Sequence, residues 1–327
     1  MVVTLHPAAD RESVVRALTA RGLTVAFVAA DADGVRIVLA PHSAAVAVSD
    51  IAKIEGVRSV AAPASAHPKI DAQGPVVDVR GVRISSDAPV AMCGPCSVES
   101  ERQIRAIAKT LGNLGVSFLR GGAFKPRTSP YAFQGHGAQA LAWMKSAADE
   151  HGLRVVTEVL SERDVDAVAE HADLLQVGSR NMQNFALLKA VARAGKPVML
   201  KRAMSATIEE WLLAGEYLLV HGAGGVVFCE RGIRGFDPAT RNLLDLGAVA
   251  LLSQVHRLPV VVDPSHAAGR RDLVPALARA GLAAGAAGVM IETHDDPGRA
   301  LSDGAQAIPL SGMAELMESL GARRRAA

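Results

Sequence analysis

The sequence predicts an α/β protein: a (β/α)8 TIM barrel preceded by a small ferredoxin-like α+β domain. Two observations carry this prediction. From about residue 88 onward, eight short apolar runs alternate with helical stretches, and residues 1–66 follow a β-α-β-β-α-β order. A chain of 327 residues is long enough for one large and one small domain. Because only 3% of the residues are aromatic, the core must consist mainly of Ala, Val, Leu and Ile.

The first domain is expected to span residues 1–66. Its predicted strands are 2–6, 24–30, 35–40 and 57–62, and its predicted helices are 12–22 and 43–56. Asp31 to Gly34 has the composition of a hairpin turn. Residues 67–327 form the second domain, which opens with the end of an Ala- and Pro-rich linker and a hairpin that turns at Gly81.

The second domain contains the eight apolar runs, each followed by a helical pattern. They are residues 89–93, 117–121, 154–159, 174–178, 198–202, 225–229, 259–263 and 288–292. Eight such units in about 235 residues fit a closed barrel. A doubly wound open sheet is the alternative, and it is disfavoured because no run leads into a G-x-G-x-x-G turn.

Bulk composition excludes several classes of protein. The chain has 35 Lys+Arg and 33 Asp+Glu, so its net charge of +2 gives no general attraction to nucleic acid or membrane. The N-terminus lacks the pattern of a signal peptide, and the most apolar long stretch is interrupted by Arg279. Three cysteines do not make a disulfide framework. These features predict a cytoplasmic enzyme.

Basic residues recur at or just after the ends of the apolar runs, where the strands of a barrel end. They are Arg120, Lys125, Arg127, Arg180, Lys201 and Arg231. The C-terminal ends of barrel strands converge on one mouth, and active sites are built there. A single arginine is more often a solvated surface charge. Six cations at equivalent positions instead predict a substrate with phosphate and carboxylate groups, or two anionic substrates.

A possible set of metal ligands lies at the same strand ends. Cys96, His266, Glu292 and Asp303 combine a thiol, an imidazole and two carboxylates. This donor set suits a divalent Mn, Fe, Co or Zn ion. Taken alone, His266 is better explained as a structural histidine, and Cys96 as an inert buried thiol is an equal alternative.

Cys93 and Cys96 form a C-x-x-C pattern. A thioredoxin-like function is disfavoured because Met92, and not Trp, precedes the first cysteine and the barrel pattern surrounds both. Oxidation of the two thiols to a pair remains open, whereas Cys229 is expected to serve packing. The remaining histidines, including His294, are expected at the surface or in loops.

Ordered motifs connect the chain to a known family. They are GPCSVES (94–100), LRGGAFKPRTSPYAFQG (119–135), VTEV (156–159), QVGSRNMQN (176–184), LKR (200–202), CERGIRGFDPATRN (229–242), VDPSHAAGRRD (262–272) and LSDG (301–304). Over about residues 76–310 the chain closely resembles the 3-deoxy-D-arabino-heptulosonate-7-phosphate (DAHP) synthases of the type I beta subfamily. The first domain also resembles the additional regulatory domain of some members.

The resemblance implies condensation of phosphoenolpyruvate with erythrose 4-phosphate, the first step of the shikimate pathway. It implies that the metal ligands are Cys96, His266, Glu292 and Asp303. It places phosphoenolpyruvate on Arg120, Lys125, Arg180, Lys201 and Arg231, and erythrose 4-phosphate on Arg127, Thr128, Ser129 and Asp263. Lys125, Glu158, Lys201 and His266 would be catalytic, with Glu158 near the attacking water. Cys93 departs from the small residue expected beside this site.

Alternatives and partners follow from the same resemblance. The sister family that makes 3-deoxy-manno-octulosonate 8-phosphate typically carries K-A-N-R-S where this chain has KPRTS, which favours erythrose 4-phosphate. A barrel that has lost catalysis and acts as a regulator is a second alternative. Residues 1–66 are expected to bind Tyr or Phe as a feedback effector at a subunit interface, with a purely structural or oligomerising domain as the alternative. The chain is expected to form a homodimer or homotetramer.

Overall fold

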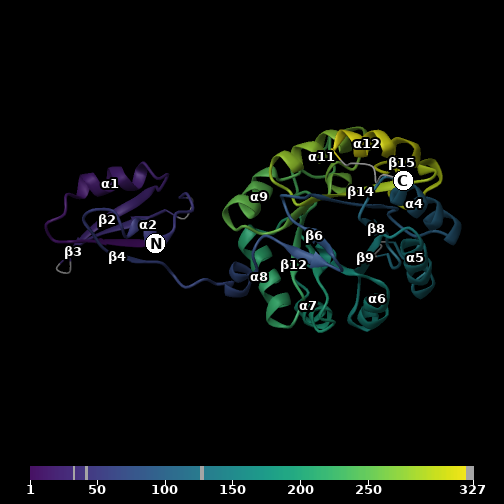
Figure 1. The fold of residues 1–327 in the computed structure, drawn as a ribbon, viewed down its shortest axis with the longest axis horizontal. Coiled ribbons are helices and arrows are strands. Elements are labelled where there is room, and N and C mark those ends of the chain that lie inside the picture. Colours follow the sequence, from purple (N-terminus) through teal and green to yellow (C-terminus); the bar gives the residue numbers. More distant parts are fainter. Residues whose placement is uncertain (32–33, 41–42, 126–128, 322–327) are drawn as a thin grey trace. The chain divides into compact units, whose positions relative to one another are not determined.

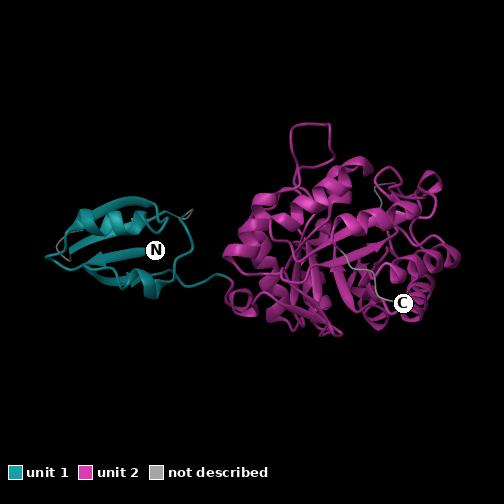
Figure 2. Ribbon diagram, turned by 45° about the horizontal axis from the view of Figure 1, so that its top comes forward, with its two compact units in different colours: residues 1–66 teal, residues 67–327 magenta. Residues whose placement is uncertain are grey.

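The computed structural model describes residues 1–31, 34–40, 43–125 and 129–321. The chain divides into two compact units, residues 1–66 and 67–327, which Figure 2 shows in different colours. In the first unit, β1 (Val2–Leu5), β2 (Val25–Asp31), β3 (Gly34–Leu39) and β4 (Val57–Ala61) form an antiparallel sheet in the order β2-β3-β1-β4. With α1 (Arg11–Thr19) and α2 (Val48–Ile51), this is the split β-α-β plan.

The second helix of this unit is much shorter than the sequence predicts. The pattern over residues 43–56 predicts one helix, but α2 covers only Val48–Ile51. The Ser43 hydroxyl instead bonds both the N–H and the carbonyl of Thr24, which holds the preceding chain beside β2. Ala47 stands at the N-cap with no side chain that can accept a hydrogen bond, so the helix lacks a start signal.

The second unit is a closed barrel of eight parallel strands (Figure 1). They are β7 (Val90–Gly94), β8 (Phe118–Arg120), β9 (Arg154–Val159), β10 (Leu174–Val177), β11 (Val198–Lys201), β12 (Val226–Glu230), β13 (Val260–Val262) and β14 (Gly288–His294). Pairing of β13 with β14 closes the ring. All eight runs that the sequence predicts as strands are therefore confirmed.

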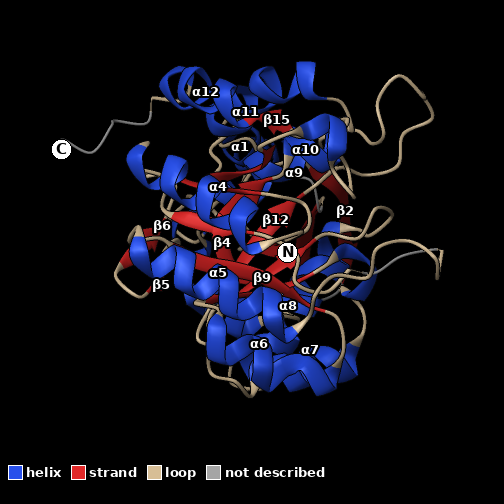
Figure 3. Ribbon diagram, turned by 90° about the vertical axis from the view of Figure 1, so that its right-hand side faces the viewer, coloured by secondary structure: helices blue, strands red, loops and turns tan. Residues whose placement is uncertain are grey.

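Helices surround the barrel, as Figure 3 shows. They are α4 (Glu101–Asn113), α5 (Ala138–Glu150), α6 (Val165–His171), α7 (Phe185–Ala192), α8 (Ile208–Val220), α9 (Leu246–Ala250), α10 (Pro264–Ala268), α11 (Val274–Ala283) and α12 (Met313–Ser319), and β15 (Ile308–Pro309) extends the sheet beside β14. Among the described residues, no helix combines the length and apolar character needed to span a bilayer.

Alternation along each strand divides the core into two clusters. Met92, Phe118 and Met199 belong to the cluster inside the barrel, whereas Cys93 and Leu119 belong to the cluster shared with the helices. The strands are buried on both faces, which explains their continuous apolar runs.

A hairpin fills the N-terminal end of the barrel. Its strands β5 (Val77–Val79) and β6 (Val82–Ile84) place Val77, Val79 and Ile84 in the interior cluster. The turn has positive φ at both Arg80 (48°) and Gly81 (84°), as the predicted turn at Gly81 requires. Arg154, the first residue of β9, donates to the carbonyl of Arg80, which fixes the hairpin at that end.

The predicted linker contains a helix that the sequence analysis does not anticipate. Residues 61–75 read as an Ala- and Pro-rich linker, but α3 (Pro68–Gln73) forms within them. The Glu216 carboxylate accepts hydrogen bonds from the backbone N–H groups of Lys69 and Ile70 at 3.0 and 2.9 Å. Ile70 is fully buried against the barrel helices. Tertiary packing and a cap from a distant helix therefore determine α3.

Candidate functional site

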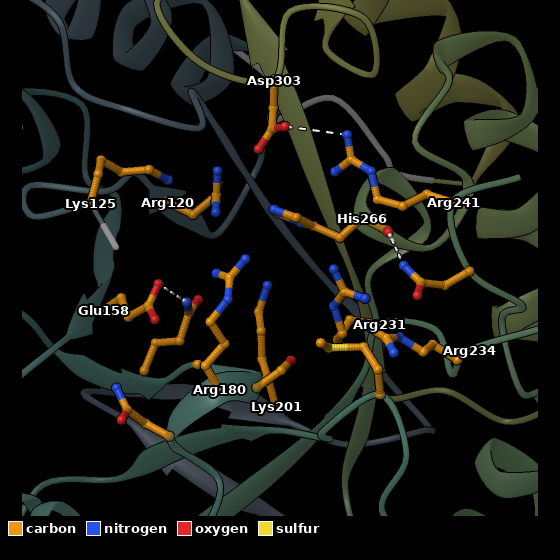
Figure 4. A pocket seen from close by; sticks show the side chains of 16 residues that line it. Arg120, Lys125, Glu158, Arg180, Lys201, Arg231, Arg234, Arg241, His266 and Asp303 are labelled. Carbon is orange, nitrogen blue, oxygen red and sulfur yellow. Dashed lines mark hydrogen bonds and ion pairs between the residues drawn. The ribbon is translucent and has the colours of Figure 1, made fainter. Parts of the chain in front are cut away.

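A cavity of about 520 Å³ opens at the C-terminal ends of the barrel strands (Figure 4). Eight of the residues predicted from strand-end position line it: Arg120, Lys125, Glu158, Arg180, Lys201, Arg231, His266 and Asp303. The parallel strands bring together side chains that are up to 183 positions apart, from 120 to 303. The predicted convergence of strand-end side chains on one mouth of the barrel is therefore confirmed.

The four predicted metal ligands gather beside this cavity. One donor atom from each of Cys96, His266, Glu292 and Asp303 lies within 4.8 Å of all the others. The Cys96 thiol donates to Asp303 Oδ2 at 3.2 Å, and His266 Nε2 lies 3.3 Å from Glu292 Oε1. Cys96 and Glu292 are buried, whereas His266 and Asp303 are partly open to the cavity. A thiol, an imidazole and two carboxylates at this spacing fit one divalent ion.

Asp263 orients the imidazole of His266. Asp263 Oδ2 accepts from His266 Nδ1 at 2.7 Å, which leaves Nε2 directed at Glu292. A metal-binding histidine needs such a partner on its second nitrogen. Asp263 also accepts from Lys201 Nζ at 2.5 Å. Burial alone would raise the pKa of Asp263, but His266 and Lys201 outweigh it and hold the pKa well below its usual range.

Cations border the cluster on its cavity side. Arg120 is 5% exposed, and its Nη1 donates to Glu292 Oε1 at 2.9 Å and to the Pro95 carbonyl at 2.8 Å. Lys125 Nζ lies 3.1 Å from both the sulfur and the carbonyl oxygen of Cys96. Burial raises the pKa of the Cys96 thiol to about 12. Burial would also raise the pKa of Glu292, but His266 and Arg120 together lower it.

Glu158 also lines the cavity and lies on the left in Figure 4, below Lys125. Its Oε2 accepts from Gln176 Nε2 at 3.3 Å. A Cβ atom on Gly178 would stand only 2.0 Å from Glu158 Oε1, so this glycine leaves the space that the carboxylate occupies. Gln176 is buried inside the barrel, as an inward-facing polar residue of β10.

The predicted erythrose 4-phosphate residues have different positions. Ser129 is described but does not line the cavity, and Asp263 is fully buried beneath it. Arg127 and Thr128 lie outside the described residues.

The segment between β12 and α9 adds cavity residues that the sequence analysis did not single out. They are Arg234, Arg241 and Asn242. Arg241 Nη2 lies 3.3 Å from Asp303 Oδ1 (Figure 4). All three belong to the motif CERGIRGFDPATRN, which continues from the end of a predicted strand, so their place after a strand end is a signal in the sequence. Gln176 was detectable as a polar residue within an otherwise apolar run.

The position of His294 corrects a prediction from the sequence. His294 was expected at the surface or in a loop, but it ends β14 and is 5% exposed, with Nε2 2.8 Å from Gln103 Nε2. Its position at the end of a buried strand explains the burial.

Cys93 packs in the cluster shared with the helices, whereas the Cys96 sulfur faces Asp303 and Lys125. Both thiols are free, and their neighbours differ.

Two contacts join the segment before α4 to the segment that carries Asp303. The hydroxyl oxygens of Ser97 and Ser302 are 2.5 Å apart. The Glu99 carboxylate accepts from the backbone N–H of Leu301 at 2.8 Å. Asp303 itself has a positive φ of 47°, which is unfavourable for a residue with a side chain. These contacts hold Cys96 and Asp303 close together.

Two curated proteins are similar to this chain over most of its length. The chain is 48% identical over 245 residues to the phospho-2-dehydro-3-deoxyheptonate aldolase of Thermotoga maritima, which covers 75% of this chain and 72% of the relative. It is 34% identical over 267 residues to the 2-dehydro-3-deoxyphosphooctonate aldolase of Alkalilimnicola ehrlichii, covering 75% of this chain and 94% of the relative. Similarity to the first protein is therefore the greater of the two.

Solved structures agree with the sequence relatives. The crystal structure of the Thermotoga maritima DAHP synthase superposes with a TM-score of 0.76 and 40% identity, covering 98% of this chain and 96% of that one. A truncated form of the Thermotoga maritima synthase gives a TM-score of 0.71 and 44% identity, covering 76% of this chain and 92% of that one. Residues 66–324 match the pattern described as the DAHP synthetase I family. The chain therefore belongs to the DAHP synthetase I family.

Proposed function

We propose that this chain condenses phosphoenolpyruvate with erythrose 4-phosphate and water to give DAHP and phosphate, the first step of the shikimate pathway. One observation carries the proposal: a cavity lined by arginine and lysine adjoins a thiol–imidazole–carboxylate cluster. Such a site can bind a multiply charged anion and act on a carbonyl group at the same mouth. Family membership gives the reaction its identity.

Phosphoenolpyruvate is assigned to Arg120, Lys125, Arg180, Lys201 and Arg231, all of which line the cavity. Arginine offers paired N–H donors to carboxylate and phosphate oxygens, and lysine offers a point charge. Partial burial lowers the pKa of Arg231, because removing a guanidinium from water disfavours its charged form. A bound dianion reduces that cost and stabilises the cluster of cations.

The second substrate is assigned to the loop after Lys125 and to Asp263. Of the three residues assigned from the KPRTS segment, Ser129 is described, and Arg127 and Thr128 lie outside the described residues. Arg234 and Arg241 extend the positive charge along the other side of the cavity. An aldose phosphate therefore meets cations on its route to the cluster.

Cys96, His266, Glu292 and Asp303 would hold a divalent ion such as Mn, Fe, Co or Zn. When bound, that ion supplies Lewis acidity to an aldehyde oxygen. The enol carbon of phosphoenolpyruvate attacks the aldehyde carbon, water adds to C2, and phosphate leaves from the resulting hemiketal. Arg120, Lys201 and Arg231 orient the anion throughout. Glu158 faces the cavity with Gln176 as its partner, in a position to orient the water. Lys125 and Lys201 provide N–H groups for proton transfer.

The test is turnover by the purified protein with Mn²⁺, phosphoenolpyruvate and each candidate aldose phosphate. We expect phosphate release with erythrose 4-phosphate and little with arabinose 5-phosphate. Turnover only with arabinose 5-phosphate would assign the chain to 3-deoxy-manno-octulosonate 8-phosphate synthesis. Binding of phosphoenolpyruvate without turnover of either aldose would support the non-catalytic alternative.

We also propose that the chain assembles into a homodimer or homotetramer and that residues 1–66 bind Tyr or Phe. The support is the separate compact unit of residues 1–66 and its β-α-β-β-α-β plan. Light scattering of the purified chain with and without each amino acid measures the assembly state directly.

A further inference from the structure

Gln306 is a fully buried glutamine beside the four-residue cluster. Its relative exposure is 0%, and its Nε2 donates to Glu292 Oε2 at 2.5 Å. Its Oε1 is one of two buried side-chain atoms without a hydrogen-bond partner among the residues that the structure describes. Burying an amide with one of its polar atoms unpaired costs free energy of folding. A residue that adds such a cost at this position points to a role other than packing.

The two carboxylate oxygens of Glu292 have separate partners. Oε1 faces Arg120 Nη1 at 2.9 Å and His266 Nε2 at 3.3 Å, whereas Oε2 faces Gln306. The terminal torsion of a glutamate is broad, so the carboxylate does not fix its own orientation. The amide of Gln306 holds one oxygen and thereby directs the other toward His266.

The backbone around Gln306 is anchored to both carboxylate ligands of the cluster. Its N–H donates to the carbonyl of Asp303 at 3.3 Å. Ile308 pairs with Thr293, the residue after Glu292, and its carbonyl accepts from the Thr293 hydroxyl at 2.8 Å. Gln306 thus occupies a fixed position between the segments that carry Asp303 and Glu292.

We propose that Gln306 is a positioning residue whose hydrogen bond to Glu292 sets the affinity of the cluster for its divalent ion. This inference rests on the proposed metal site. Hydrogen bonds from surrounding residues orient carboxylate ligands, and their loss typically weakens metal binding about 10- to 100-fold. If Gln306 served only packing, replacing it with leucine would leave metal affinity unchanged. Leucine fills a similar volume and carries no unpaired amide oxygen.

The experiment measures Co²⁺ affinity in the full-length, metal-free protein. Thiolate-to-cobalt absorption reports binding through Cys96, and a chelator of known affinity provides competition. We expect Gln306→Leu to raise the Co²⁺ dissociation constant about 10- to 100-fold. Gln306→Asn keeps the amide but is one methylene too short, so it should also bind more weakly. This second variant keeps the test decisive if the leucine variant does not fold.

Gln73→Leu is the matched control at the opposite end of the barrel. Gln73 exchanges two hydrogen bonds with the backbone of Val226, so its loss affects folding but not the cluster. It should retain wild-type Co²⁺ affinity. Wild-type affinity in both Gln306 variants, or equal weakening in Gln73→Leu, would overturn the positioning role. A wild-type protein that binds no Co²⁺ would instead overturn the metal site itself.

Discussion

At the scale of single residues, buried charges at the mouth of the barrel stabilise one another as ion pairs. Lys201 and Asp263 are 4% and 0% exposed and form an ion pair, and Asp263 also orients His266. Removing one partner of a buried pair leaves an uncompensated charge, which costs about 3–5 kcal/mol. Substitution of Lys201 or Asp263 would therefore affect folding and activity together. Neutral residues at the cluster give clearer tests.

Cys96→Ala should abolish metal-dependent activity while leaving the fold intact. We expect kcat to fall about 10³-fold, because Lewis acidity contributes several kcal/mol to lowering the barrier. Metal content by elemental analysis and steady-state rates measure the effect. Cys93→Ala is the matched control, because Cys93 packs toward the helices. It should keep both its metal and the wild-type sensitivity to peroxide. Protection from peroxide in Cys93→Ala would instead support a Cys93–Cys96 redox pair.

Gly178→Ala should displace Glu158 from the cavity wall. The new methyl group would lie 2.0 Å from Glu158 Oε1, so the carboxylate has to move. A displacement of about 1 Å near reacting groups costs about 10²-fold in rate. We expect kcat to fall while the dissociation constant of phosphoenolpyruvate, measured by calorimetry, changes little. Gly312→Ala has its nearest contact at 3.5 Å and should retain wild-type kinetics. Full activity in Gly178→Ala would show that Glu158 does not have to remain in this position.

At the scale of elements, local patterns identified the barrel strands but not every helix. Each strand is buried on both faces, so its apolar run is a strong and local signal. By contrast, α3 depends on Glu216, which lies 146 positions from Ile70, and no local pattern reports such a cap. The site divides in the same way. Strand-end residues such as Arg120 were predictable from their position in the sequence. Gln306 was not, because its hydrogen bond to Glu292 forms only when the chain folds and no sequence pattern indicates it.

The N-terminus of α8 carries a capping box whose contribution depends on pH. Thr207 and Glu210 bond each other's backbone, and these hydrogen bonds, led by that from the Thr207 backbone, lower the pKa of Glu210. A lowered folded-state pKa stabilises the fold above the ordinary glutamate pKa of about 4.3, and the effect is lost as the pH falls through the lowered value. Thr207→Ala should cost about 1 kcal/mol at neutral pH.

Urea unfolding of the wild type and Glu210→Gln between neutral and acidic pH tests the pH dependence. The free energy of unfolding of the wild type should fall more steeply below about pH 4.3 than that of the variant. Glu315→Gln, an exposed substitution on α12, is the control and should follow the wild type. Parallel curves for wild type and Glu210→Gln would contradict the contribution of the capping box.

At the scale of the whole molecule, the two compact units have separate cores. Residues 1–66 bury their own cluster around Val3, Leu18 and Ile37, and the barrel has its own interior and helix-facing clusters. A core of its own is the condition for a unit to fold without the other.

Deletion of residues 1–66 should therefore leave an active barrel that Tyr and Phe no longer inhibit. The barrel buries interior and helix-facing clusters of its own, which supports a stable barrel after the deletion. Initial rates of the full-length and truncated proteins at increasing Tyr or Phe measure the effect. Inhibition that persists after the deletion would assign the effector site to the barrel. A full-length protein insensitive to both amino acids would favour a structural role for residues 1–66.

The hairpin at the N-terminal end of the barrel limits the directions from which a molecule can reach the cavity. Because β5 and β6 fill that end, the described part of the cavity is reached from the C-terminal side. Arg120 and Lys201 lie deep and buried, whereas Arg241 is exposed at the rim. A molecule held by the deep cations must arrive before one that rests nearer the rim, and it must depart after it. We therefore expect obligatory-order kinetics in which phosphoenolpyruvate, proposed above to bind Arg120 and Lys201, binds first, and initial rates over a matrix of both substrate concentrations measure this order.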